Sequence, residues 1–359
     1  MRCRNLLPLL LVITIAACSP PKIETTPEGF PPTSSPLPTS PPTASLRPTP
    51  TALPPSHPPI TVDCAFQLEP HLSDTLGDSV LSVDWFPGDY RIAVVVAPDG
   101  LLYLDPYTLK SVPLALPDVP RPRVVAVAPY GEFLAVGESG GTIHILGPNG
   151  DPVFDDPAHE PRELTSLSWS PGGSYLASGG KDNRIRILPV PQFEPTAPLE
   201  FGFGPVNSVD WAPNGELIAA GGEPMNLSVW HFPSRVHLVS LRLKPDPRNV
   251  VAWLHESDML ASAGMGISVL QLSSGLTWSF GQGVYFTSLA ASPIDNLIIA
   301  GASVPSPMLF AFEPTTRVTL AALPLPSPAV VLKFSRSGNL LAAGLADGTI
   351  ILWQCPEHP

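Results

Sequence analysis

The chain has 359 residues, of which 19 are basic and 31 are acidic, and its formal net charge at pH 7 is −12. A surface with this excess of negative charge repels nucleic acid and anionic lipid head groups. We therefore expect no nucleic-acid partner and no electrostatic contact with a membrane.

The first 17 residues have the pattern of a secretory signal peptide. Two arginines precede an apolar run, Leu6 to Ile15, which is too short to span a membrane as a stable helix. The segment ends in Ile15-Ala16-Ala17-Cys18, which resembles the lipobox of bacterial lipoproteins. This resemblance implies cleavage after Ala17 and acyl chains on Cys18 that anchor the protein. The alternative is an ordinary signal peptide that leaves Cys18 free.

Residues 18–59 are expected to form a tether and not a folded domain. Beyond Cys18 they are dominated by Pro, Ser and Thr, so they cannot bury enough apolar surface to offset their ordering entropy. Proline favours an extended backbone of about 3.1 Å per residue, and such a tether spans on the order of 100 Å. A PxxP ligand for an SH3-like partner is the alternative function of this segment.

Residues 60–359 contain a pattern that recurs seven times: a strand, a tight turn, a second strand that ends in small residues, and a third strand. Turn positions about 42 residues apart, with one shorter interval, have the period of propeller blades. These positions are Pro87, Pro129, Pro171, Pro213, His255, Pro293 and Arg336. The pattern predicts an all-β fold, a seven-bladed β-propeller of four-stranded antiparallel blades.

Large aromatic residues recur two positions before the turn, and small residues recur at the end of the second strand. The aromatic residues are Trp85, Trp169, Trp211, Trp253 and Phe334. The small runs include Ala177-Ser178-Gly179 and Ala219-Ala220-Gly221. Both patterns are typical of packing between neighbouring blades, so we predict that these residues belong to the core.

Several of these units resemble WD repeats. Three tracts match in register: SLSWSPGGSYLASGGKDNRIRIL, SVDWAPNGELIAAGGEPMNLSVW and LKFSRSGNLLAAGLADGTIILW. The terminal Trp lies at Trp230 and Trp353, and the turn Asp lies at Asp182 and Asp347. The resemblance implies a ring that holds partners on its rims. The family's Gly-His dipeptide is absent, so we expect that the buried Asp-His-Ser-Trp network of many members does not form.

The resemblance also implies how the ring closes. In such propellers an N-terminal strand, here Ile60 to Leu68, lies beside the C-terminal strand, here Thr349 to Gln354, in the last blade. Cys64 and Cys355 would then lie on adjacent strands, and we predict a disulfide between them. With Cys3 in the signal and Cys18 lipidated, the pairing leaves no cysteine over. Two free thiols are the alternative.

No catalytic or metal-binding motif has the structural context that its chemistry requires. Residues 137–141 match G-x-S-x-G, but an alternating strand, and not a helix, follows them, so a hairpin turn is expected. The eight histidines are scattered, without metal-ligand spacing. His159-Glu160 and His255-Glu256 are interpreted as loop or turn pairs. We predict no enzyme activity, no metal site and no cofactor.

The sequence supports two functions. The first is a monomeric, membrane-anchored lipoprotein that displays a non-catalytic propeller outside the cell membrane to bind a protein, peptide or glycan. The second is an enzyme or a small-molecule or glycan receptor that uses the central channel. Residues from distant loops can assemble on the axis of such a ring, and the sequence does not show whether they do.

One rim is the predicted partner site. It contains aromatic residues in glycine-flanked stretches outside the repeating pattern, together with polar residues at equivalent loops. The aromatic residues are Phe203, Trp278 and Tyr285, and the polar residues are Arg123, Lys181 and Glu223. Aromatic side chains bury a large area at a low cost in rotamer entropy, which favours them as binding anchors. Packing of these aromatics between blades five and six, or under the outer strands, is the alternative.

Overall fold

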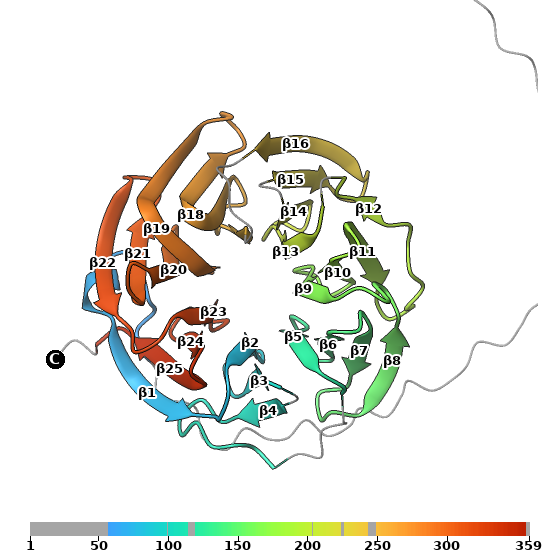
Figure 1. The fold of residues 1–359 in the computed structure, drawn as a ribbon, viewed down its shortest axis with the longest axis horizontal. Coiled ribbons are helices and arrows are strands. Elements are labelled where there is room, and N and C mark those ends of the chain that lie inside the picture. Colours follow the sequence, from blue (N-terminus) through green and yellow to red (C-terminus); the bar gives the residue numbers. More distant parts are fainter. Residues whose placement is uncertain are drawn as a thin grey trace, which may run out of the picture. The chain divides into compact units, whose positions relative to one another are not determined.

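The computed structural model describes residues 57–98, 100–113, 119–202, 204–223, 226–242 and 249–356. The predicted signal peptide, Cys18 and nearly all of the predicted tether lie outside the described residues, and so does Phe203. The described chain forms a ring of antiparallel β-sheets around an open centre (Figure 1). The strands of each blade are designated a to d from the centre outward.

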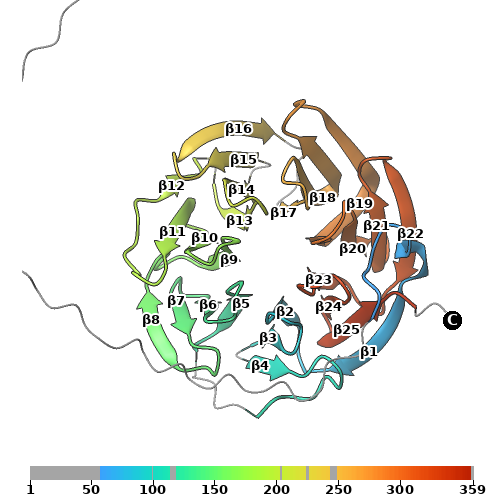
Figure 2. The same ribbon diagram turned by 180° about the vertical axis from the view of Figure 1, so that it is seen from behind.

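The first four blades follow the chain in order around the ring (Figures 1 and 2). Blade one contains β2 (Val80–Trp85), β3 (Ile92–Val96) and β4 (Gly100–Leu104), and blade two contains β5 (Pro122–Val127), β6 (Leu134–Glu138), β7 (Ile143–Leu146) and β8 (Pro152–Asp156). Blade three contains β9 (Leu164–Trp169), β10 (Tyr175–Gly180), β11 (Arg184–Pro189) and β12 (Leu199–Glu200). Blade four contains β13 (Val206–Trp211), β14 (Leu217–Gly222), β15 (Asn226–His231) and β16 (Val236–Arg242). Among the described residues, a d strand of blade one is reduced to a single bridge between Leu104 and Ser111.

Blades five and six share one six-stranded sheet. It contains β17 (Val250–Trp253), β18 (Met259–Gln271), β19 (Thr277–Ala291), β20 (Ile298–Val304), β21 (Met308–Glu313) and β22 (Val318–Pro324). The first part of β18 pairs with β17, and its second part pairs with the start of β19. The later part of β19 pairs with β20, so one continuous strand is both strand d of blade five and strand a of blade six.

Blade seven closes the ring with a strand from the N-terminal side. It contains β23 (Ala329–Phe334), β24 (Leu341–Leu345) and β25 (Thr349–Gln354), and β1 (Glu69–Thr75) pairs antiparallel with β25. The predicted closure is therefore confirmed, but the predicted strand limits of Ile60 to Leu68 are wrong. That segment contains a short 3-10 helix, η1 (Ala65–Gln67), because its apolar residues Ile60, Ala65 and Leu68 pack into the core of blades six and seven.

The predicted disulfide is present, although its cysteines do not lie on adjacent strands. Cys64 is the N-cap of η1, and Cys355 directly follows β25. The two Cα atoms are 6.0 Å apart, and 291 residues separate the cysteines in sequence. The bridge therefore joins the two ends of the ring beside the β1–β25 pairing.

The recurring aromatic residues form the contacts between neighbouring blades, as predicted. All five end their a strands and are buried. Three indoles donate a hydrogen bond to an a-strand carbonyl of the preceding blade: Trp85 to Lys333 O at 3.1 Å, Trp169 to Ala126 O at 3.0 Å and Trp253 to Asp210 O at 3.2 Å. A buried N–H without a partner is costly, so these bonds also align successive blades.

The small residues that end the b strands leave room for the next blade. A Cβ added at Gly137 would lie 2.8 Å from Val124 and would also collide with Leu164 of blade three. At Gly179 it would lie 2.6 Å from Val206 of blade four. The predicted core role of these positions is confirmed, because any larger side chain would push the blades apart.

Among the described residues, no helix has the length and apolar character needed to cross a membrane.

Candidate interaction rim and central channel

The ring has two rims with different connections. The b–c rim contains the turns between strands b and c and the loops that enter strand a, and the a–b rim contains the turns between strands a and b. The polar rim candidates from the sequence lie on the b–c rim, but the structure places the described aromatic candidates within strands. Trp278 and Tyr285 both belong to β19, because the glycine-flanked stretch continues as strand from blade five into blade six.

Tyr285 forms part of an exposed apolar row on the b–c rim. It is the register partner of Met265 in β18 and of Val304 in β20. The side chains of Met265 and Val304 are 56% and 55% exposed, and Tyr285 is half-buried between them. We name Met265, Tyr285 and Val304 the apolar row. It stands on one sheet that spans two blades, so its backbone is held by strand pairing on both sides.

Trp278 lies on the outer part of blade five and not on the rim. It is the register partner of Val269, and its half-buried ring packs against the core shared by blades five and six. The guanidinium group of Arg317 lies 4.9 Å from the centre of the indole. These contacts match the alternative stated above for the aromatics, namely packing between blades five and six.

Two of the polar candidates meet at the junction of blades two and three. One carboxylate oxygen of Glu163 accepts a hydrogen bond from the Lys181 ammonium group. Arg123 Nε lies 3.6 Å from the other carboxylate oxygen. The Lys181 N–H also donates to the Glu163 carbonyl at 2.9 Å. Glu223 lies one blade further on, where its N–H donates to the Pro205 carbonyl at 3.0 Å. The predicted polar residues are therefore rim residues, but they do not surround the apolar row.

Blade three contains a buried hydrogen-bond network that the sequence analysis predicted to be absent. His159 is fully buried, and its Nδ1 lies 2.8 Å from Asp182 Oδ1. Its Nε2 lies 2.8 Å from Ser178 Oγ. The prediction failed because the loop after β8 supplies the histidine without a preceding glycine. The signals that could have found it are the turn Asp182 and the b-strand Ser178; Leu188 occupies the position of the family's Trp, so three of the four members are present.

The G-x-S-x-G segment is the β6–β7 hairpin, as predicted. Glu138 N–H donates to the Thr142 carbonyl at 3.0 Å, and Gly141 N–H donates to the Glu138 carbonyl at 3.2 Å. Ser139 therefore lies in a β-turn and not in a strand-to-helix elbow. Among the described residues, no three His, Cys, Asp or Glu side chains are grouped closely enough to hold a metal ion.

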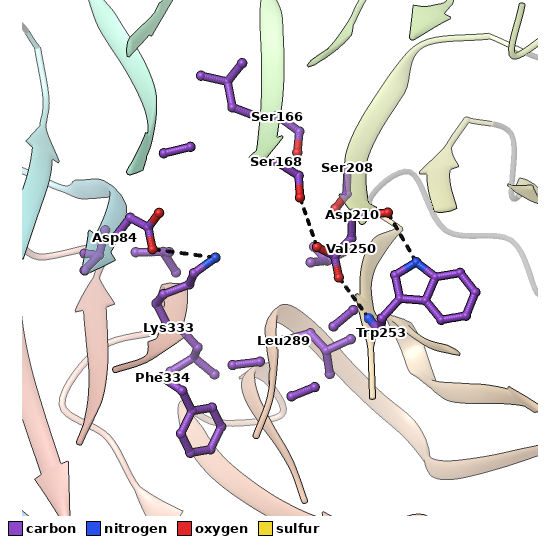
Figure 3. Close-up of a pocket in the computed structure, with 18 of the residues that line it drawn as sticks. Asp84, Ser166, Ser168, Ser208, Asp210, Val250, Trp253, Leu289, Lys333 and Phe334 are labelled. Atoms are coloured by element: carbon purple, nitrogen blue, oxygen red, sulfur yellow. Dashed lines mark hydrogen bonds and ion pairs between the residues drawn. The ribbon is translucent and has the colours of Figure 1, made fainter. Parts of the chain in front are cut away.

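Rings of equivalent side chains from the a strands line the central channel (Figure 3). The first ring contains Ser82, Val124, Ser166, Ser208, Val250, Ser288 and Val331. The second ring contains Asp84, Ala126, Ser168, Asp210, Ala252, Ala290 and Lys333. At the a–b rim the channel is lined by Pro129, Pro171, Pro213, His255, Pro293 and Arg336. The cavity volume is about 570 Å³, within the range of small-ligand sites.

Several polar groups of the channel serve the backbone of the next blade. The a strand is the inner edge of each sheet, where some N–H groups have no strand partner. Ser82 accepts a hydrogen bond from the Val125 N–H at 3.1 Å, and Asp84 accepts one from the Val127 N–H at 2.8 Å. Between blades four and five, Ser208 accepts a hydrogen bond from the Val251 N–H at 3.3 Å, and Asp210 accepts one from the Trp253 N–H at 2.9 Å. Ser166 and Ser168 repeat the pattern with Val209 at 3.0 Å and Trp211 at 3.2 Å.

The fold and the repeats agree with known WD40 propellers. The family model "WD domain, G-beta repeat" matches residues 150–187, 197–231 and 327–354. A chain in a crystal structure of the mitotic checkpoint complex superposes with a TM-score of 0.72 at 19% sequence identity, and the match covers 80% of this chain and 96% of that chain. No curated protein matches in sequence. The chain therefore contains WD40 repeats and has the fold of a WD40 β-propeller.

Proposed function

We propose that this protein is a non-catalytic interaction protein that binds a protein, peptide or glycan partner through the b–c rim of its propeller. The apolar row is the observation that supports this function. Two strongly exposed apolar side chains flank a tyrosine on a rigid two-blade sheet, and exposed apolar groups on a rigid support are favoured contact points for partners. Rims of WD40 propellers generally hold protein partners, which agrees with this assignment.

We also propose that the protein acts outside the cell membrane, held by acyl chains on Cys18. The lipobox-like ending of the signal segment supports the anchor, and the Cys64–Cys355 disulfide agrees with an oxidising, extracytoplasmic compartment. Substituting Cys18→Ser should release the protein from the membrane fraction or block its processing. Normal processing with equally firm membrane retention would contradict the anchor.

Site-specific photocrosslinking on intact cells tests the rim. A photoreactive amino acid replaces Met265 in one variant and Leu238 in a matched control, since Leu238 is similarly exposed, at 49%, on the outer strand β16. We expect a discrete crosslinked species from position 265 and not from position 238. Equal crosslinking from both positions, or none from position 265, would contradict the proposed site.

A charge substitution provides an independent test of the same surface. Met265→Asp places a carboxylate in the apolar row and should abolish partner crosslinking from position 304. Leu238→Asp introduces the same charge elsewhere and should leave that crosslinking unchanged. Because both side chains are largely exposed, neither substitution should alter the thermal unfolding midpoint much.

A further inference from the structure

We propose that the central channel is a second binding site, which takes a carboxylate group between Lys333 and Arg336. This activity goes beyond the partner binding proposed for the b–c rim. Both residues belong to blade seven: Lys333 lies in β23, and Arg336 lies in the turn that follows it. Both line the channel.

Lys333 presents to the channel an ammonium group that is ion-paired but has no hydrogen bond shown within the described chain. Its side chain is 49% exposed and extends into the open space between the strands of blades one and four (Figure 3). The one polar contact of the ammonium group within the described chain is an ion pair with Asp84 Oδ1 at 3.7 Å, which is too long for a hydrogen bond. An ammonium group has three N–H donors, so it can donate a hydrogen bond to a ligand oxygen without breaking an existing one.

Arg336 presents a second cation at the a–b end of the same channel. Its Nη2 donates to the Val127 carbonyl at 2.8 Å, and its Nε lies 3.4 Å from the Trp85 carbonyl. These bonds hold the guanidinium group over blades one and two. The same Nη2 lies 3.7 Å from Asp84 Oδ2, so both cations approach one carboxylate from its two oxygens.

The carboxylates near these cations already accept hydrogen bonds from backbone N–H groups of the protein. Asp84 is 5% exposed and accepts the N–H groups of Trp85 and Val127 at 3.0 and 2.8 Å. The buried Asp89 accepts hydrogen bonds from the N–H groups of Arg336 and Ser337 at 2.8 and 3.3 Å, and the half-buried Asp210 accepts one from the N–H group of Trp253. Backbone N–H groups therefore share the compensation of this negative charge with Lys333 and Arg336, and the exposed parts of both cations still face a ligand in the channel.

The walls beside Lys333 leave room for a ligand. Ala126, Ala252 and Ala290 occupy the same ring, and the cavity of about 570 Å³ suits a small organic molecule or one extended side chain. A carboxylate fits the two cations because charge-assisted hydrogen bonds from Lys and Arg to carboxylates are short and strong. The source of the carboxylate is either a free organic acid or an acidic peptide side chain.

Titration calorimetry with the full-length protein distinguishes these sources. Succinate is the probe for a free acid, and the blocked peptide acetyl-Ala-Glu-Ala-amide is the probe for a side chain. Succinamide has the same shape without the charge and serves as the ligand control. We expect saturable binding of at least one carboxylate probe and none of succinamide. Failure of both carboxylate probes to bind, or equal binding of succinamide, would overturn the proposal.

Two channel variants and one surface variant test the assigned residues. Lys333→Met should weaken the binding of the carboxylate probe by about tenfold or more, since it removes one charged donor. Lys110→Met removes an exposed lysine outside the channel lining and should leave affinity unchanged. Asp84→Asn removes the internal carboxylate that shares both cations and should tighten binding. Unchanged affinity in folded Lys333→Met protein would overturn the assignment whatever the rim crosslinking shows.

Discussion

The buried imidazole of His159 lies 2.8 Å from the carboxylate of Asp182, and its other nitrogen lies 2.8 Å from Ser178 Oγ. This relationship fastens the loop that enters blade three to the b–c turn of the same blade. The His159 N–H also donates to the Gly141 carbonyl at 3.0 Å, and the Lys181 N–H donates to the Glu163 carbonyl at 2.9 Å. The histidine therefore connects blades two and three at the b–c rim.

Substituting His159→Ala should lower the free energy of unfolding by roughly 1–3 kcal/mol, because it leaves two polar groups without their partner in a buried setting. His144→Ala is the matched control: His144 bonds to Asp155, whose side chain is 67% exposed, so water can replace that bond. Urea unfolding measures both losses. Losses of equal size would contradict a special role for the buried network.

Reduction of the Cys64–Cys355 bridge should lower the melting temperature without dissolving the ring. The bridge closes a 291-residue separation, and in the chain-entropy model such a loop contributes about 5 kcal/mol. The β1–β25 pairing and the blade cores remain after reduction. Thermal unfolding with and without reductant measures the effect, and Cys64→Ser protein should not respond to reductant. Peptide mapping that finds both thiols free in protein from its native compartment would contradict the bridge.

Alanine at Gly141 should be far more destabilising than alanine at Gly77. Both glycines have a strongly positive φ, +104° and +120°, so both substitutions incur the same kind of backbone strain. A Cβ at Gly141 would also collide with the Arg162 carbonyl and lie 2.7 Å from Glu160 N, whereas a Cβ at Gly77 meets nothing within 4 Å. Unfolding midpoints of the two variants measure the difference. Similar midpoints would contradict the expected cost of the clash, because the loop that enters blade three would then shift to make room for the Cβ at Gly141.

Asp210→Asn should change how stability depends on pH. Burial raises the pKa of Asp210 above its ordinary value of 3.8, although the hydrogen bond from Trp253, the charge of Lys333 and the hydrogen bonds from Ser168 and Trp211 oppose the shift. A raised native pKa gives a stabilising contribution that is complete below the unfolded pKa and is lost as pH rises through the native pKa. Wild type should therefore lose stability relative to Asp210→Asn between acid and neutral pH, as measured by urea unfolding across that range.

The half-buried Asp258 provides the opposite sign as a control. The hydrogen bond from Ser273 holds its pKa below the ordinary value. Its stabilising contribution is present above the unfolded pKa and is lost as pH falls through the native pKa. Asp258→Asn should cost more stability at neutral than at acid pH. The same pH trend for both variants would contradict the assigned cause of the Asp210 shift.

The sequence by itself determined the blade repeat and the contacts between blades. Strand alternation and turn residues act over a few neighbouring positions, so Pro87 and its equivalents mark the turns wherever they occur. The Trp residues before those turns are large and apolar at the same place in blades one, three, four and five, and all are buried. Pairing of the last two cysteines followed from ring closure, although the closing strand begins at Glu69 and not at Ile60.

The tertiary structure decided the features that depend on residues far apart or on strands that depart from the repeat. Met265, Tyr285 and Val304 meet because β19 continues through the glycines that the sequence suggested were loop. His159 reaches Ser178 because a loop of irregular length folds back over blade three. Lys333 and Arg336 meet Asp84 only when blade seven closes against blade one. Local periodicity does not predict these contacts, because each forms only when the whole ring closes and brings distant segments together.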